Sequence, residues 1–477
     1  MKQEMTGAEI VLQSLVDQGV EVVFGYPGGA VLPIYDTLFK HNSIKHVLVR
    51  QEGGAIHAAE GYARSTGKVG VVLVTSGPGA TNVVTGLTDA MMDSIPIVCI
   101  TGQVPQHLIG SDAFQECDTT GITRPCTKHN YLVKDPNKLS PVFHEAFTIA
   151  QDGRPGPVLI DIPKDVQFAN GTYTEKEKVI IPSHRLFEPE IFKNDEKINE
   201  VLNLISKAKK PIFYIGGGCI NSGPKASELV AQLVEMTGAP ATMTLMGLGV
   251  LGSSHPNSLG MLGMHGMYEA NMAMHDCDVM INIGARFDDR VTGRLDAFSP
   301  NSKKIHIDID ESNINKTIKV DVPVVGDVTS VLKRVVKAWK DNNLQTNESD
   351  LKLWWDKINK WKTIDCLHFT NNEKEIKPQY AIQRLYELTK DKKTFITTEV
   401  GQHQMWAAQY YKFEKPNRWL TSGGLGTMGY GFPAAIGAQV ANPDALVIDV
   451  AGDASILMNI QEMSTAVQYR LPVKIFI

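Results

Sequence analysis

Short apolar runs alternate with amphipathic stretches along the first part of the chain. The runs lie at residues 20–25, 46–49, 69–76, 95–101 and 156–162. Each run is nearly unbroken and rich in β-branched residues, which is typical of strands buried on both faces of a parallel sheet. We therefore expect a doubly wound α/β domain over residues 1–170, followed by a polar, proline-containing linker at 171–192.

The same alternation of apolar runs and helical stretches returns twice. One set of runs predicts a second α/β domain over residues 193–341, and another predicts a third domain over 377–477. The chain is therefore expected to form three doubly wound parallel-sheet domains. Residues 342–376 are charged and carry three tryptophans, so we expect a connecting helix there. The runs of the last two domains lie at 211–216, 241–246, 278–284, 304–310, 394–400, 418–423, 445–452 and 472–477.

The last apolar run ends at the last residue of the sequence, Ile477. A parallel α/β domain rarely ends on a strand that would lie within the sheet. We therefore expect the chain to be C-terminally truncated and the third domain to be incomplete.

Composition narrows the class of protein. The 477 residues suggest about three domains, at roughly 150 residues each. A net charge of −5 gives no electrostatic footprint for nucleic acid, and no apolar run approaches the ~20 residues of a membrane span. The six cysteines are scattered without a close pair, which predicts reduced thiols in a cytoplasmic protein. At the N-terminus, Thr6 and Glu9 predict a helix capping box.

A strand, a glycine and an aspartate followed by a helix occur in VIDVAGDASILMNIQE, residues 447–462. Free backbone N–H groups at the start of a helix bind phosphate, and an aspartate there can hold Mg²⁺ against a diphosphate. Asp453 could equally be an ordinary N-cap. Two further glycine-containing turns, at 399–406 and 421–438, follow strands of the same predicted domain. Turns at the carboxyl ends of strands in one sheet converge on its ligand crevice.

The first domain carries a second signal, in residues 50–68. Glu52 lies between a predicted strand and a predicted helix, and glycines follow it. A glutamate at this place is often only a favourable charge at a helix N-terminus. The neighbouring segment 74–90 contains Gly-Pro-Gly, which lets the backbone approach a ligand closely.

Together these segments resemble the thiamine-diphosphate enzymes. In that superfamily one domain binds the pyrimidine through a glutamate, and another binds the diphosphate through Gly-Asp-Gly and a later Asn-Asn. Glu52 matches the glutamate, and Gly452 with Asp453 matches the start of the metal motif. Ala454 replaces the third glycine, and the expected place of Asn-Asn lies beyond Ile477.

Six segments, in order, resemble the acetolactate synthase catalytic subunits more specifically. That resemblance implies decarboxylation of pyruvate on thiamine diphosphate and transfer of the two-carbon unit to a second 2-keto acid, in branched-chain amino acid biosynthesis. It also implies a homodimer or homotetramer with active sites shared between subunits, and it leaves a small regulatory subunit possible. The segments lie at 23–36, 101–118, 153–166, 262–266, 284–293 and 420–439.

The resemblance also assigns roles to individual residues. Glu52 would assist proton removal through the pyrimidine, Asp453 would bind Mg²⁺, and Met428 would hold the cofactor bent. Arg290 would hold the carboxylate of the second substrate, although a salt bridge with Asp288 or Asp289 is its ordinary alternative. The other catalytic candidates are Gln103 and Lys164, the substrate candidates are Gly28, Phe114 and Gln115, and the diphosphate candidates are Gly401, Gln402, His403, Gly426, Gly452, Ala454 and Ser455.

The second domain resembles the FAD domain of the same family, in which the flavin is not needed for redox chemistry. Asp308 or Asp310 could hold a ribose hydroxyl at a second-strand end. Taken alone, the glycine triplet at 216–218 could be only a tight turn. The FAD candidates are Arg154, Gly216, Gly217, Gly218, Thr244, Leu245, Leu262, Gly263, Met264, His265, Gly284, Arg286, Asp288, Asp308, Ile309 and Asp327.

Three other functions are consistent with parts of the pattern. A flavin-dependent pyruvate oxidase is the nearest, but the strings GARFDDR and LGMHG favour the synthase. A glyoxylate carboligase would lack the glutamate found here as Glu52. A non-catalytic nucleotide-binding module would need neither Glu52 nor the turns of the third domain. The choice between pyruvate and 2-ketobutyrate as acceptor stays open.

Overall fold

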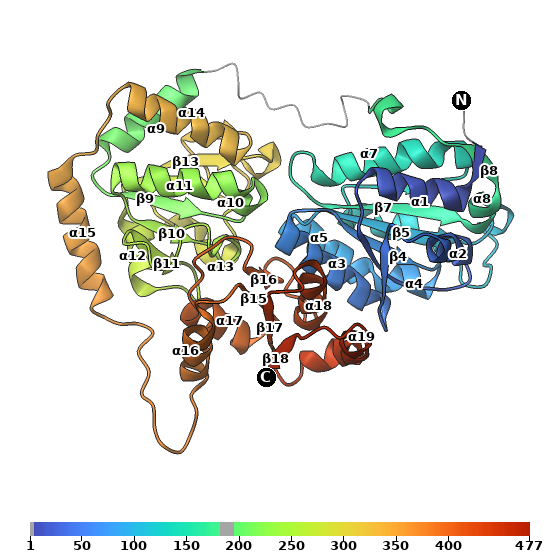
Figure 1. Ribbon diagram of the computed structural model, residues 1–477. Helices are drawn as coiled ribbons and strands as arrows, with labels where there is room; N and C mark the ends of the chain where they lie inside the picture. Colours follow the sequence, from blue (N-terminus) through green and yellow to red (C-terminus); the bar gives the residue numbers. More distant parts are fainter. Residues whose placement is uncertain (1–3, 182–194) are drawn as a thin grey trace. The chain divides into compact units, whose positions relative to one another are not determined.

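The computed structural model describes residues 4–181 and 195–477 (Figure 1). Residues 182–192, half of the predicted linker at 171–192, and the first two residues of the domain predicted at 193–341 therefore lie outside the described residues. The chain divides into two compact units, each discontinuous in sequence. The first contains Met1–Phe187, Lys392–Gly401 and Leu420–Ile477, and the second contains Glu188–Asp391 and Gln402–Trp419.

The larger sheet of the first unit has the strand order β3-β2-β4-β5-β7-β6, and every neighbouring pair is parallel. The parallel α/β fold predicted for this part is thus confirmed, although the sixth strand, β6, was not foreseen. The strands are β2 (Val22–Tyr26), β3 (Lys45–Leu48), β4 (Gly70–Val74), β5 (Ile97–Gln103), β6 (His129–Leu132) and β7 (Pro157–Pro163). A separate antiparallel pair, β1 (Glu4–Thr6) with β8 (Asn170–Thr172), was also not foreseen.

Helices cover both faces of this sheet. Helices α1, α2, α7 and α8 contribute to the apolar core on one face, and α3 and α5 contribute to the core on the other. Thr6 and Glu9 form the predicted capping box at the start of α1. The helices are α1 (Gly7–Asp17), α2 (Leu32–Lys40), α3 (Glu52–Thr66), α4 (Pro78–Asn82), α5 (Val84–Asp93), α6 (Thr119–Thr123), α7 (Leu139–Gln151) and α8 (Lys164–Phe168).

The first unit contains a second sheet, of order β16-β15-β17-β18, in which β17 pairs parallel with both β15 and β18. It lies within the third domain predicted at 377–477, but residues 377–391 and 402–419 of that range belong to the second unit. The strands are β15 (Thr394–Thr398), β16 (Trp419–Thr421), β17 (Leu446–Val450) and β18 (Lys474–Phe476), and the helices are α18 (Gly431–Ala441) and α19 (Met463–Gln468).

Helices α3 and α18 join the two parts of the first unit at very short range. A Cβ atom on Gly61 of α3 would overlap the backbone of Ala434, and one on Gly437 of α18 would overlap the carbonyl of Ala58. Glycine is therefore required at both positions for the helix backbones to approach this closely. The residues around the crossing are mostly alanine, and they are buried.

The second unit contains a parallel sheet of order β11-β10-β9-β12-β13-β14. The chain enters at β9, adds β10 and β11 on one side, and then crosses to add β12, β13 and β14 on the other. The strand order therefore reverses between β9 and β12, which is where open α/β sheets bind ligands. The strands are β9 (Pro211–Ile215), β10 (Ala241–Met243), β11 (Ser258–Met261), β12 (Val279–Ile283), β13 (Lys303–Asp308) and β14 (Val322–Val325).

The predicted connecting helix is present in the second unit as α15, and it packs through its tryptophans. Trp354 is buried, and its indole N–H donates to the carbonyl of Pro211 at 3.0 Å. The helices of this unit are α9 (Asp195–Lys207), α10 (Gly218–Asn221), α11 (Pro224–Thr237), α12 (Tyr268–Asp276), α13 (Asp289–Thr292), α14 (Val328–Asp341), α15 (Glu348–Lys362), α16 (Pro378–Thr389) and α17 (Gln402–Tyr410). Among the described helices, none has the length and apolarity needed to cross a membrane.

Replacing Gly437 with valine tests the close crossing of α3 and α18. The added side chain has no room against Ala58, so the helices must separate or shift. We expect the free energy of unfolding to fall by about 1–3 kcal/mol, as overpacked cores do. Chemical denaturation measures this. Gly29→Ala is the matched control, because a Cβ at Gly29 meets no atom within 4 Å. Equal stability of the two variants would contradict the crossing.

Candidate functional site

Glu52 is the first residue of α3 and follows β3 closely. Its side chain is half-buried, and its Oε2 accepts a hydrogen bond from the Asn82 amide at 2.8 Å. Gln51 caps the helix, since its side chain accepts from the backbone N–H of Gly54 at 3.2 Å. Glu52 is therefore held at the positive end of a helix, at the carboxyl edge of the sheet.

Three turns meet near Glu52 at the same edge of the sheet. A Cβ on Gly28, after β2, would lie 2.5 Å from the Thr75 side chain, after β4. A Cβ on Gly77 would lie 2.8 Å from the carbonyl oxygen of Gln115. These turns flank the point between β2 and β4 where the strand order reverses. The structure therefore brings the predicted substrate residues Gly28 and Gln115 to the carboxyl edge where α3 begins.

Gln103 ends β5, and its side chain is fully engaged within the protein. Its Nε2 donates to the carbonyl of Cys117 at 2.7 Å and to Asp161 at 2.9 Å, and its Oε1 accepts from the N–H of Val104 at 2.9 Å. Burial raises the pKa of Asp161 to about 7. Because Gln103 is buried, it would have to exchange these bonds to contact a substrate. Its predicted catalytic role stays a prediction.

The other candidates of the first unit lie in varied surroundings. Lys164 begins α8, directly after β7, and is half-exposed. The ring of Phe114 is 87% exposed. Arg154 donates to the hydroxyl of Ser94 at 2.8 Å and to the carbonyl of Met92 at 3.2 Å, beside the C-terminus of α5. The role of Arg154 in binding FAD stays a prediction.

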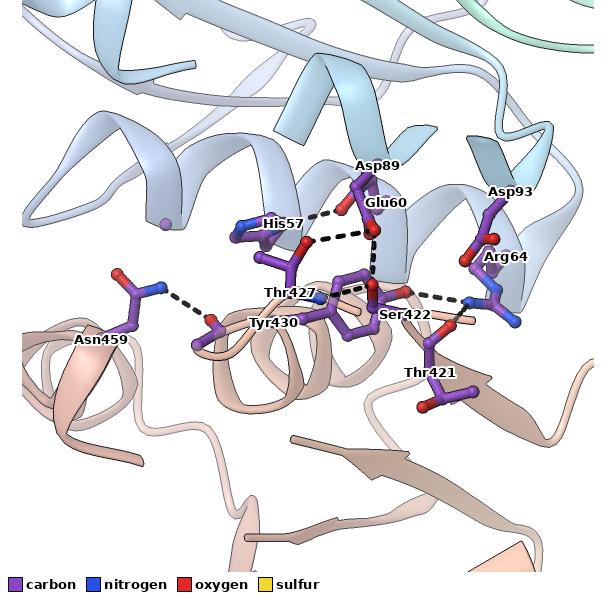
Figure 2. Close-up of polar contacts among 12 residues, drawn as sticks. His57, Glu60, Arg64, Asp89, Asp93, Thr421, Ser422, Thr427, Tyr430 and Asn459 are labelled. Carbon is purple, nitrogen blue, oxygen red and sulfur yellow. Dashed lines mark hydrogen bonds and ion pairs between the residues drawn. The ribbon is translucent and has the colours of Figure 1, made fainter. Parts of the chain in front are cut away.

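The glycine-rich turn between β16 and α18 carries Met428, whose side chain is 42% exposed. Glu399, directly after β15, binds this turn. Its carboxylate accepts the backbone N–H of Gly429 at 2.6 Å and that of Phe432 at 3.0 Å. The Asn459 amide donates to the carbonyl of Gly429 at 2.6 Å, as Figure 2 shows. Backbone groups that follow Met428 are thus bound.

Glu399 and its neighbour Asp449 were not foreseen from the sequence. Both are buried, and Asp449 accepts from the Thr397 hydroxyl at 3.1 Å. Burial raises the pKa of Glu399, and burial together with the Glu399 charge raises the pKa of Asp449. The available signal was an acidic residue inside each of two apolar runs, at 394–400 and 445–452.

One cleft of about 600 Å³ lies between the two parts of the first unit. It opens beside the N-terminus of α3, and the Met428 turn forms its opposite wall. The structure therefore places the surroundings of Glu52 and those of Met428 around one space in a single chain. The lining residues are Arg50, Gln51, Gly53, His57, Thr81, Asn82, Thr85, Thr427, Met428, Met458, Asn459 and Gln461.

The predicted metal motif forms an exposed turn after β17. The backbone N–H of Gly452 donates to the Ser455 hydroxyl at 3.1 Å, and Asp453 and Ala454 are exposed between them. The next helical segment begins at Ile456 with Ser455 at its N-cap, so Asp453 caps no helix. That ordinary alternative for Asp453 is therefore wrong.

The remaining diphosphate candidates divide between the two units. Gly426 adopts a positive φ of 76° and donates its N–H to the Ser422 hydroxyl at 3.0 Å. Gly401 is the last residue of its segment of the first unit, whereas Gln402 and His403 open α17 in the second unit. The predicted binding of diphosphate by these residues stays a prediction.

In the second unit, two glycine turns touch at the point where the strand order reverses. The N–H of Gly216 donates to Ile283 at 2.9 Å, and the N–H of Gly218 donates to Gly284 at 3.0 Å. Gly284 has a φ of 67°, and a Cβ there would lie 2.8 Å from the Cα of Gly218. Residues 216–218 are thus more than an isolated tight turn. They form a backbone-lined edge between β9 and β12, where a dinucleotide pyrophosphate binds in folds of this kind.

Other predicted FAD residues follow strands of the same sheet. Thr244 accepts the N–H of Gly247 at 3.1 Å, across the short turn that contains Leu245. Asp308 ends β13, the second strand of the half that runs from β12 to β14, and it accepts the N–H of Asp310 at 2.8 Å. Ile309 lies between them. Asp327 caps α14 through the N–H of Ser330 at 2.9 Å.

The turn after β11 packs against Arg290. The N–H of Met264 donates to the carbonyl of Arg290 at 2.8 Å. Gly263 has a φ of 104°, and a Cβ atom at this position would lie too close to the carbonyl oxygen of Arg290. The turn also contains Leu262, which is buried, and His265, whose carbonyl accepts from the Gln409 amide at 2.8 Å.

The Arg290 guanidinium lies 3.5 Å from Asp289, and both side chains are mostly exposed. Asp288 accepts from the backbone of Arg290 at 2.9 Å and from Arg286 at 3.0 Å. The ordinary alternative for Arg290, a surface ion pair, is therefore present in this structure. Such exposed pairs are weak, and a substrate carboxylate could displace them.

Three family models match the chain. The model described as the N-terminal TPP binding domain of thiamine pyrophosphate enzymes matches residues 5–122. The central domain of the same enzymes matches residues 198–335, and their C-terminal TPP binding domain matches residues 399–477. The three matches follow the order of the three main sheets.

Curated relatives match over almost the entire chain. An acetolactate synthase large subunit of Buchnera aphidicola (subsp. Schizaphis graminum) is 52% identical, over 99% of this chain and 81% of the relative. The Escherichia coli acetolactate synthase isozyme 3 large subunit is 50% identical, over 98% of this chain and 81% of the relative. A chloroplastic acetolactate synthase of Arabidopsis thaliana is 48% identical, over 100% of this chain and 70% of the relative.

Proposed function

Because the chain belongs to the acetolactate synthase family of thiamine-diphosphate enzymes, we propose that it joins a two-carbon unit from pyruvate to a second 2-keto acid. The family and the three-sheet fold predicted from the sequence are thereby confirmed. The observation that carries the proposal is the cleft of the first unit, where the Glu52 turn faces the Met428 turn. The acceptor is pyruvate or 2-ketobutyrate.

The residues around the cleft fit thiamine diphosphate. When bound, this cofactor supplies a carbon nucleophile that attacks the keto group and accepts the electrons released with carbon dioxide. Glu52, which lies between the lining residues Gln51 and Gly53, offers a half-buried carboxylate with one oxygen held by Asn82, which suits a hydrogen bond to a ring nitrogen. In that position Glu52 would hold a proton at the pyrimidine and return it during the reaction.

Met428 and Arg290 have separate tasks in this proposal. The partly exposed Met428 side chain would support the cofactor from the wall opposite Glu52. Arg290 would exchange its exposed contact with Asp289 for the carboxylate of the acceptor. A guanidinium suits this task, because it binds a carboxylate through two parallel hydrogen bonds. Gln103, Lys164, Gly28, Phe114 and Gln115 remain the other proposed residues near the substrates.

The turn after β17 fits a Mg²⁺ ion with a diphosphate. Asp453 is exposed there and caps no helix, and carboxylate oxygens are ligands that Mg²⁺ prefers. Ala454 and Ser455 offer backbone and hydroxyl groups beside it. We therefore keep Asp453 as the proposed metal ligand of this chain.

The second unit fits FAD at the edge between β9 and β12. The glycine turns at 216–218 and 284 leave the backbone bare at the place where the strand order reverses. Asp308 is buried at the end of β13, where one carboxylate oxygen accepts the N–H of Asp310 and the other accepts the Asn313 amide at a long 3.4 Å, which a ribose hydroxyl would replace. We propose that this unit binds FAD without using it for redox chemistry.

The proposed assembly is a cytoplasmic homodimer or homotetramer with shared active sites and a small regulatory subunit. Two of the relatives are named large subunits, which supports a smaller partner. In this chain α3 and α18 pack within one unit. In the proposed dimer the same two surfaces pair across subunits, as exchange of identical elements allows.

Replacing Glu52 with glutamine tests the catalytic proposal. Loss of the proton-holding group should lower acetolactate formation from pyruvate by about 10²–10⁴-fold. Glu228→Gln is the matched control, because Glu228 lies in an exposed pair with Lys225 in the second unit, and it should retain full activity. Acetolactate and oxygen are measured together, and oxygen uptake should be absent. Equal rates for the two variants, or oxygen uptake in step with pyruvate loss, would refute the proposal.

A mixed dimer of Glu52→Gln and Asp453→Asn chains tests the shared site. If the sites form across subunits, one site of the mixed dimer has both native residues and the other has neither. We expect about half of the wild-type activity per dimer, whereas each parent variant is inactive. Differently tagged chains allow the mixed dimer to be purified. No recovery of activity would show that each site closes within one chain.

A further inference from the structure

Helix α5 carries two aspartates, one helical turn apart, that hold the glycine-rich turn of the Met428 segment. Asp89 Oδ1 accepts from the Ser422 hydroxyl at 2.5 Å and from the Thr427 hydroxyl at 3.2 Å (Figure 2). Asp93 accepts the backbone N–H groups of Gly423 at 2.8 Å and Gly424 at 2.7 Å. A helix from the part of the unit that contains Glu52 therefore fixes the turn that carries Met428.

The Ser422 hydroxyl transmits the effect of Asp89 to the backbone. A hydroxyl has one proton to donate and two lone pairs that accept. Ser422 donates its proton to Asp89, so its lone pairs accept the N–H of Gly426 at 3.0 Å and the N–H of Thr427 at 2.8 Å. Gly426 and Thr427 are the two residues directly before Met428. The Asp89 carboxylate thus fixes the orientation of the Ser422 hydroxyl, and that hydroxyl fixes the backbone at Gly426 and Thr427.

We propose that Asp89 is a positioning residue that sets Met428 in the cofactor cleft through Ser422. The inference rests on the proposed function, because it assigns Met428 to the support of thiamine diphosphate. Thr427 and Met428 both line the cleft, whereas Asp89 is buried behind them and does not. Asp89 therefore acts on the cofactor only through the turn.

The surroundings of Asp89 indicate a role beyond stability. Among the described residues, Asp89 Oδ2 and Glu60 Oε1 are buried without a hydrogen-bond partner. His57 Nδ1 lies 2.8 Å from the other oxygen of Glu60. Burial and the neighbouring carboxylate raise the pKa of Asp89, and burial raises that of Glu60. An incompletely bonded acidic pair destabilises a fold, and here the bonded oxygen of Asp89 fixes the geometry of the turn through Ser422 and Thr427.

Arg64 and Tyr430 lie beside the same turn. Arg64 of α3 donates to the Tyr430 hydroxyl at 3.2 Å and to the carbonyl of Thr421. Asp93 lies near enough to influence the pKa of both Glu60 and Arg64. The turn is thus bonded at Thr421 by Arg64, and at Ser422 and Thr427 by Asp89.

The contacts of Asp89 with Ser422, Thr427 and Glu60 define a conservative variant. Asp89→Asn keeps an oxygen acceptor for Ser422 and Thr427 and turns an amide toward Glu60 in place of the unbonded oxygen. It therefore retains the positioning contact. Asp89→Ala removes the acceptor and frees Ser422 to rotate. Asp36→Asn is the surface control, because Asp36 lies in an exposed pair with Lys40.

The test is a double-substitution cycle on the affinity of the full chain for thiamine diphosphate with Mg²⁺, measured by calorimetry at a temperature where circular dichroism shows every variant folded. Asp89→Ala and Met428→Ala should each weaken binding by about tenfold. The double variant should bind no more weakly than the weaker single variant, to within about twofold. Asp89→Asn and Asp36→Asn should bind like the wild type.

Ser422→Ala is the second route, for use if Asp89→Ala does not fold. It removes the transmitting hydroxyl and should also show no further loss in combination with Met428→Ala. Losses that multiply in either double variant would overturn the positioning role and leave the proposed function standing. Equal losses for Asp89→Asn and Asp89→Ala would also overturn it. No binding by the wild-type chain would overturn both.

Discussion

The close crossing of α3 and α18 is the constraint on which the first unit depends. Glycines at positions 61 and 437 let each helix backbone contact the other directly, where any side chain would overlap backbone atoms. This contact places the N-terminus of α3, with Glu52, and the turn before α18, with Met428, beside one cleft. The chemistry proposed for the protein therefore follows from a packing requirement that involves no reacting group.

Buried carboxylates fix the glycine-rich turn that the helix crossing places beside the cleft. Asp89 and Asp93 hold the glycine-rich turn from one side, and Glu399 holds it from the other. A turn rich in glycine has little conformational preference of its own, so its geometry comes from these acceptors. The unfavourable burial of acidic groups is thus concentrated around the segment whose position matters most to the proposed reaction.

The sequence predicts the three sheets well, because their central strands are unbroken apolar runs. It fails where strands are polar or interrupted, as in β6, in β11 with its glycine, and in β14 with Pro323. Glu52 and Asp453 were found because each lies at a strand end beside glycines. Asp89 was missed, since its partner Ser422 is 333 residues away along the chain and nothing local marks the pair.

Hydrogen–deuterium exchange with and without thiamine diphosphate and Mg²⁺ tests most directly whether the two turns share one cofactor. We expect the ligand to slow exchange in both the segment 51–57 and the segment 422–429, since residues of both line the cleft. We expect no change in α15, which lies in the second unit. Slowed exchange in only one of the two segments, or in neither, would contradict the account.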